Sequence, residues 1–185
     1  VEVENLITQV LIIYNLYLFN LSKYFYLYII MSVPNHYYSG LSKKNTKQQL
    51  NELKKSQKLY KKGKYHIRKK MPSFKGKKSK HVVNFERKFC TNISDLPAVA
   101  KVTGVPVSAL KKIIKKGMGA YYSSGSRPNQ NAHSWAYARL ASTLTKNNAY
   151  RVDKHILDEA GVKIKPPSKK RSKKCDKFRK KKTQN

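Results

Sequence analysis

The side chains of this chain that could do chemistry are overwhelmingly cationic. Its 185 residues contain 41 lysines and arginines against 9 aspartates and glutamates, a formal net charge of +32 at pH 7. Self-repulsion at such a charge opposes compaction, so we expect a polyanionic partner to neutralise it. Cationic side chains that bind phosphates release counterions, which yields affinity whatever the base sequence. Nucleic acid is therefore the predicted partner, with DNA preferred over other polyanions.

The predicted nucleic-acid-binding side chains occur in four groups along the chain. They are Lys54, Lys55, Lys58, Lys61 and Lys62, then Ser108, Lys111, Lys112 and Lys115, then Arg127 and Arg139, and finally Lys169, Lys170 and Arg171. The second group lacks the Arg, Asn and Gln side chains that read base edges, which favours contact with phosphate. For Arg127 and Arg139 two interpretations stay open, a phosphate-binding pair or a structural ion pair.

Catalytic chemistry has little support in the sequence. Ser123 and Ser124 would be nucleophiles only beside a general base, and none stands at a recognisable spacing. Asp153, Asp158 and Glu159 crowd one late segment, where salt bridges within a basic protein are expected rather than a metal site. We therefore predict a protein that is not an enzyme and that needs no cofactor.

The two cysteines, Cys90 and Cys175, do not pair with each other or with histidines at a spacing typical of metal sites. No metal is therefore predicted. Free thiols in a reducing compartment are the expected state of both residues.

Residues 1–30 differ in composition from the rest of the chain, because they are mostly apolar. Residues 10–30 form an apolar run long enough to span a bilayer. The composition changes at Met31, and the run consists of residues that AT-rich codons encode. We therefore expect residues 1–30 to be read-through of upstream DNA, with a membrane anchor and a buried helix as alternatives. A membrane is a predicted partner only if residues 10–30 are truly translated.

Residues 31–80 are predicted to form a basic arm with one helix. Thr46 would cap that helix, which would run to about Lys62 with a thin apolar stripe. Residues 63–80 have no periodicity and contain Gly and Pro, which predicts a flexible cationic linker. Tyr65 and Phe74 stand among its lysines and could stack on bases or play no part in binding.

Residues 81–162 are predicted to be a small all-helical domain, which makes the fold class mainly α. Its most informative stretch is 94–117, where Ser94 would cap one helix and Gly117 would end the next. The stretch resembles a helix-turn-helix, with Ala100, Gly104 and Leu110 in the small, turn and apolar positions of that motif. The second helix either enters a DNA major groove or is only part of an architectural hairpin.

The remainder of the domain is predicted from the same signals. Residues 117–131 are rich in Gly and Ser and predict a loop, and Asn131 would cap a helix to about Thr145. Trp135 is expected to anchor the core from this helix. A last helix over 150–160 would stop at Gly161. Residues 163–185 are predicted to be a disordered basic tail, typical of a nuclear-localisation or genome-packing segment.

A second resemblance rests on the string KKGMGAYYSSGSRPNQNAHSWAYARLAS. It is similar to the signature of an uncharacterised lysine-rich protein family of giant DNA viruses, and related segments occur in large tailed phages. The similarity covers about residues 93–160, and the YYSGLSKK string at Tyr37 also looks familial. The resemblance implies a viral origin and no particular activity.

Together these observations predict a non-enzymatic viral DNA-binding protein, associated with the virion, that packages or condenses the genome by neutralising phosphate. It would lie in the virion interior and in the host's cytoplasmic virus factory or nucleus. The alternative is a structural virion protein whose basic surface meets an acidic capsid or core protein or a membrane.

Overall fold

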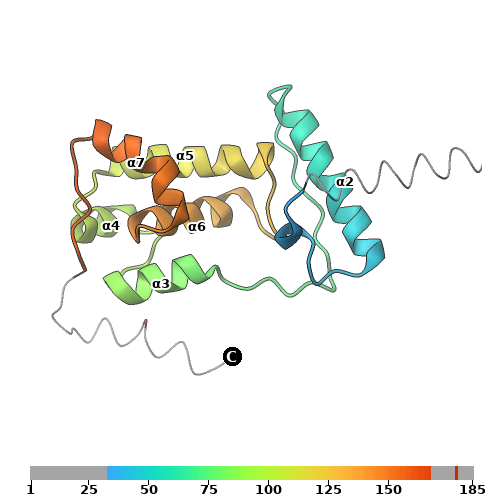
Figure 1. Cartoon of the computed structure of the whole chain (residues 1–185), viewed down its shortest axis with the longest axis horizontal. Helices are drawn as coiled ribbons and strands as arrows, with labels where there is room; N and C mark the ends of the chain where they lie inside the picture. The colour runs from blue at the N-terminus through green and yellow to red at the C-terminus, as the bar shows by residue number, and fades with distance from the viewer. Residues whose placement is uncertain (1–32, 168–177, 179–185) are drawn as a thin grey trace, which may run out of the picture. The chain divides into compact units, whose positions relative to one another are not determined.

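The computed structural model describes residues 33–167 and Phe178. Regular structure in this part is helical: η1 (Asn35–Tyr37), α2 (Lys43–Tyr60), α3 (Lys80–Phe89), α4 (Leu96–Thr103), α5 (Val107–Ser123), α6 (Ala132–Leu144) and α7 (Asn148–Glu159) (Figure 1). The predicted mainly α fold with a small helical module is confirmed. No helix among the described residues is long and apolar enough to cross a bilayer. The predictions for residues 1–30 lie outside the described part.

The chain divides into two compact units, residues 1–51 and 52–185, so that α2 begins in the first and ends in the second. In the first unit, the Gln49 side chain donates a hydrogen bond to the Tyr37 carbonyl at 3.2 Å. The Ser42 hydroxyl accepts from the Asn45 backbone N–H at 3.4 Å. The helix therefore starts before Thr46, the predicted cap, because Ser42 already supplies an acceptor for its first turn.

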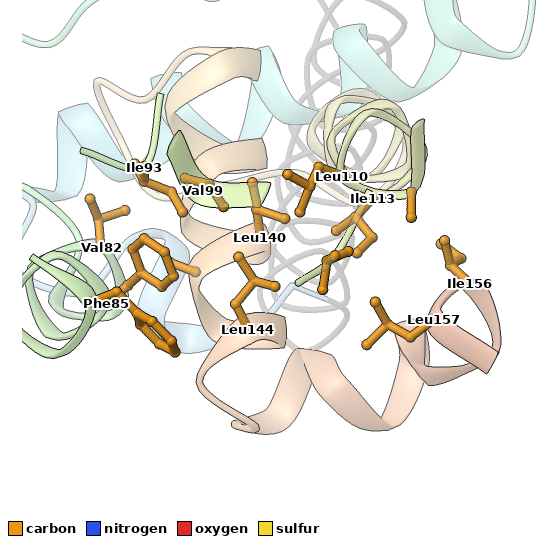
Figure 2. Close-up of a cluster of buried hydrophobic side chains, with 14 residues drawn as sticks. Val82, Phe85, Ile93, Val99, Leu110, Ile113, Leu140, Leu144, Ile156 and Leu157 are labelled. Atoms are coloured by element: carbon orange, nitrogen blue, oxygen red, sulfur yellow. The ribbon is translucent and has the colours of Figure 1, made fainter. Parts of the chain in front are cut away.

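The core of the second unit is built from α3 to α7 (Figure 2). α3 contributes Phe85, α4 contributes Val99, α5 contributes Ile113 and α6 contributes Leu140, all fully buried, and α7 adds Leu157 at 2% exposure. Each of these residues stands on the apolar stripe of an amphipathic helix, so that five short helices share one cluster. For α3, α4 and α5 the buried residues are those that the spacing of apolar residues predicts, whereas on α7 Val152, which the sequence predicts to face inward, is 54% exposed.

The hairpin of α4 and α5 follows the predicted helix-turn-helix pattern. Gly104 ends α4 in the left-handed region, with φ +72°, and its N–H donates to the Ala100 carbonyl at 2.8 Å. The cap at the start of α4 is Asp95, whose carboxylate accepts from the Ala98 N–H at 3.1 Å. Ser94 is not the cap, because its hydroxyl donates to the Asn92 side chain.

α5 does not stop at Gly117 but continues to Ser123, so the predicted loop over 117–131 is wrong in its first half. The glycine serves a close helix contact instead of a helix end. An added Cβ at Gly117 would lie 2.8 Å from the Ala136 Cα of α6 and 3.1 Å from its Cβ. In Figure 1, α5 and α6 accordingly run side by side. The continuation of α5 adds two turns that carry side chains of the candidate site.

Replacement of Gly117 by alanine should destabilise the protein. The new Cβ would meet the backbone of Ala136, which cannot move without separating α5 from α6. Overpacking of this kind costs about 1–3 kcal/mol, more than the ~0.5–1 kcal/mol that alanine gains over glycine inside a helix. Chemical denaturation would measure the loss. Gly76→Ala is the control, because its Cβ would have an ordinary 3.8 Å contact with Asn129. Equal stability of the two variants would contradict the close contact.

α6 begins as predicted, with Asn131 and Ser134 forming a reciprocal capping box. Its buried face is different from the predicted one, because Ala136 and Leu140 are fully buried whereas Trp135 is only half-buried. Trp135 is not a member of the buried cluster, so the expectation of a core anchor there is wrong. Because Gly117 comes so close to α6, only a small residue such as Ala136 fits at the inward position there. α7 ends before Gly161, which has φ +63°, as the sequence predicts.

Candidate functional site

A shallow groove of about 590 Å³ lies in the second unit and is lined mostly by α5. The lining residues from α5 are Lys112, Lys115, Lys116, Gly119, Ala120 and Ser123, joined by Tyr60 from the end of α2, Arg139 from α6 and Val152 from α7. The groove therefore gathers four cationic side chains with the hydroxyl-bearing side chains of Tyr60 and Ser123. Such a set of donors fits an anionic group.

The helical repeat of α5 explains why these lysines share one side. Leu110, Ile113 and Gly117 are buried against the other helices. Residues one or two positions away along a helix point elsewhere, so Lys112, Lys115 and the later turn at Gly119 face outward together. Because Gly119 has no side chain, α5 comes close to the Tyr60 hydroxyl, which an added Cβ would approach to 3.1 Å.

One wall of the groove is fixed by a buried carboxylate. The Asp153 side chain is fully buried, and the Arg139 guanidinium donates two hydrogen bonds to it, from Nε at 2.8 Å and from Nη2 at 2.7 Å. The Thr143 hydroxyl donates to the same carboxylate at 2.9 Å, and the Lys116 ammonium lies 3.3 Å from it. This bidentate geometry is the strong form of an ion pair, and it holds Arg139 in place. Arg139 is thus a structural ion-pair partner that also borders the groove.

The electrostatics of this network favour the charged form of Asp153. Burial raises the pKa of Asp153, but the hydrogen bonds and charge of Arg139, with the Thr143 and Lys116 donors, more than offset it and lower the pKa below 3.8. Lys112 and Lys115 are exposed by contrast, and the Lys112 ammonium lies 3.5 Å from the exposed Glu159 carboxylate. The two exposed lysines are therefore the side chains best placed to meet an anion from solution.

The structure brings some of the predicted binding residues together and leaves others apart. Lys112, Lys115 and Arg139 line the groove. Exposed residues that do not line it are Lys55 and Lys58 on α2, Lys61 and Lys62 just after α2, Ser108 and Lys111 on α5, and Arg127 in the loop after α5. Lys54 is half-buried on α2. Lys169, Lys170 and Arg171 lie outside the described residues.

Sequence reasoning missed Lys116 and Tyr60 as groove residues. Lys116 was placed at the end of a helix because Gly117 looks like a stop signal. Lys112 and Lys116 stand one helical turn apart within the helix that the sequence predicts, so this spacing is the signal that could have identified Lys116. Tyr60 carries no such signal, because it comes from a distant part of the sequence.

The segment 63–80, predicted to be a flexible linker, is irregular up to Ser79, and side chains of the helical module that follows it hold it in place. The Arg68 guanidinium donates to the Tyr121 carbonyl at 2.7 Å and lies 3.7 Å from the centre of the Tyr121 ring. The Asn129 side chain accepts from the Met71 N–H at 2.7 Å and donates to the Met71 and Phe74 carbonyls at 2.9 and 2.6 Å. Met71 is buried at 1% exposure. These contacts fix the segment against the module.

Two other chemical features concern the serines and the cysteines. The Ser123 and Ser124 hydroxyls lie 3.4 Å from each other. No group of three or more His, Cys, Asp or Glu side chains that could hold a metal occurs between residues 33 and 167. The Cys90 sulfur lies 3.9 Å from the Arg87 carbonyl oxygen, and Cys175 lies outside the described residues.

Comparison with known proteins places the chain in a family without a known activity. No curated protein matches the chain, and no solved structure matches it. A family model does match, over residues 34–160. The match is wider than the signature over 93–160 that the sequence suggested, and it includes α2, the segment 63–80 and every residue that lines the groove. The chain belongs to the family of unknown function DUF5824.

Proposed function

We propose that this protein is a non-enzymatic DNA-binding protein of a large DNA virus, and that the groove on α5 binds the phosphate backbone. The observation that carries the proposal is the gathering of Lys112, Lys115, Lys116 and Arg139 around one open groove. Oriented cations in a concave surface attract phosphate and release its counterions on binding. The net charge of +32 extends this attraction well beyond the groove.

The network around Asp153 supports this role for the groove. Arg139 and Lys116 share one buried carboxylate, so their combined charge exceeds that of their partner. Lys112 and Lys115 add two exposed ammonium groups on the same helix. Lysine side chains contact phosphate as point charges, without selecting a base. The groove is therefore suited to backbone binding, and α5 need not enter the major groove.

In this proposal the remaining lysines add charge-neutralising contacts around the groove. The protein would condense or package the viral genome, act inside the virion, and be present in the host's cytoplasmic virus factory or nucleus. The string around the Arg127 loop, through which the chain resembles a lysine-rich family of giant viruses, supports a viral source.

Lysine footprinting tests where DNA binds. The full chain is labelled with an amine-reactive acetylating reagent, with and without duplex DNA, and the modified lysines are identified by mass spectrometry. We expect DNA to protect Lys112 and Lys115 strongly. Lys88 and Lys101 are the controls, because both are exposed and neither lines the groove. Undiminished labelling of Lys112 and Lys115 on a DNA-bound chain would sink the proposal for this groove. Protection only by an acidic protein would favour the structural alternative.

A further inference from the structure

In residues 65–68, just after α2, side chains that face solvent alternate with side chains that face the protein. His66 and Arg68 turn toward the module, where His66 Nε2 lies 2.8 Å from the Glu52 carboxylate and Arg68 donates to the Tyr121 carbonyl at 2.7 Å. Tyr65 and Ile67 alternate with them and are 70% and 88% exposed. Alternation of this kind is typical of extended backbone. Of these two outward side chains, Tyr65 is the one with an aromatic ring, so it is the one that offers a surface on which a base can stack.

Tyr65 is held in position by other tyrosines. Its ring packs edge-on against Tyr122 with centroids 5.0 Å apart, and the Tyr60 ring lies 6.0 Å away. Tyr60 and Tyr122 are themselves stacked at 5.9 Å with planes 16° apart. The Ser56 hydroxyl donates to the Tyr122 carbonyl at 3.3 Å, which ties this cluster to α2. An aromatic ring that is already fixed loses little entropy when it stacks on a ligand.

The tyrosine cluster, defined as Tyr60, Tyr65 and Tyr122, borders the cationic groove. Tyr60 belongs to both, and Tyr122 is the neighbour of the groove residue Ser123. Exposed lysines Lys61, Lys62 and Lys64 stand beside Tyr65 in the sequence. An aromatic platform beside a positively charged groove is the arrangement that binds single-stranded nucleic acid, whose phosphates follow the groove while its bases stack. In a duplex the bases are already stacked on each other and are closed to Tyr65.

We infer that this face binds unpaired nucleotides, with the strand's phosphates in the groove and a base stacked on Tyr65. The inference rests on the proposed phosphate-binding role of the groove and adds single strands or unpaired regions to the nucleic acids that this face binds. It also accounts for the exposure of Tyr65, which packing of the helical core does not require.

The test measures the affinity of the full chain for a fluorescent oligothymidylate and for a hairpin duplex with the same number of phosphates. Stacking of one base contributes about 1–3 kcal/mol, so Tyr65→Ala should weaken binding to the single strand about 5- to 150-fold. Tyr65→Phe should keep the affinity, because the ring remains. Duplex binding should change little in either variant. Ile67→Ala, in the same exposed segment, is the control and should bind the single strand nearly as well as the natural chain.

An oligouridylate of the same length distinguishes RNA from DNA as the bound strand. Loss of affinity in Tyr65→Ala for either strand supports the inference, and the strand bound more tightly identifies the nucleic acid. Equal binding of Tyr65→Ala and the natural chain to both single strands would overturn the inference. If DNA binding were still abolished by salt in that case, the proposed function would stand without the stacking site. Circular dichroism would confirm that the exposed substitution leaves the helices intact.

Discussion

Replacement of Asp153 by asparagine is expected to lower the free energy of unfolding by about 3–5 kcal/mol, the usual cost of removing one partner of a buried ion pair. The Asp153 side chain is fully buried, and it accepts two hydrogen bonds from Arg139, whose own side chain is 18% exposed. The amide would leave Arg139 without a countercharge and would turn an NH₂ group toward a guanidinium. The same change would remove the charge that the Lys116 ammonium faces at 3.3 Å and leave that ammonium with its hydrogen bond to the Val152 carbonyl, so one wall of the groove would also be weakened.

Chemical denaturation of Asp153→Asn and Asp158→Asn checks this expectation. Asp158 stands on the same helix but is exposed, so its variant should stay within about 0.5 kcal/mol of the natural chain. An effect of similar size in both variants would show that the network around Asp153 does not hold α6 and α7 together.

The free energy of unfolding should also depend on pH through the Asp153 carboxylate. Because the pKa of Asp153 is lower in the folded protein than the ordinary 3.8, its contribution is fully present above pH 3.8 and is lost as the pH falls through the folded value. The natural chain should therefore lose stability more steeply than Asp153→Asn below about pH 4. Parallel curves for the two proteins would contradict this.

A second large effect is expected from salt on DNA binding. If the chain contacts 6–10 phosphates, its affinity for duplex DNA should fall about 10³- to 10⁵-fold between roughly 50 and 200 mM salt. A net charge of +32 makes a contact number of this size reasonable, since far fewer cations are needed than the chain carries. Fluorescence anisotropy at several salt concentrations measures the fall. An affinity that does not depend on salt would rule out phosphate neutralisation as the mode of binding.

Much of the fold could be predicted because local signals and tertiary packing agree. The apolar stripe of α3 and the turn at Gly104 indicate the same helices that the structure has. The capping box at Asn131 marks the start of α6 correctly. In each case the residues that decide the structure are neighbours in the sequence, so periodicity and capping rules suffice.

The failures occur where a distant partner decides the structure. Gly117 has the local properties of a helix stop, yet it is required by Ala136 on another helix. The segment 63–80 has the composition of a linker, yet Asn129 binds its backbone from 58 residues away in the sequence. The candidate site shows the same division. Lys112 and Lys115 could be predicted from the outer face of α5, whereas the role of Arg139 depends on its ion pair with Asp153 on another helix. No local pattern contains these pairings.

The most direct test of the phosphate-binding groove compares two double variants of equal charge by salt titration with DNA. Lys112→Ala/Lys115→Ala removes the two exposed groove lysines, and Lys88→Ala/Lys101→Ala removes two exposed lysines that do not line the groove. Each lost phosphate contact reduces the slope of log affinity against log salt by about 0.9. For the groove variant we predict a slope that is smaller by the amount expected for about two lost phosphate contacts. For the control we predict an unchanged slope. Equal slopes for the two variants would contradict the assignment of the groove.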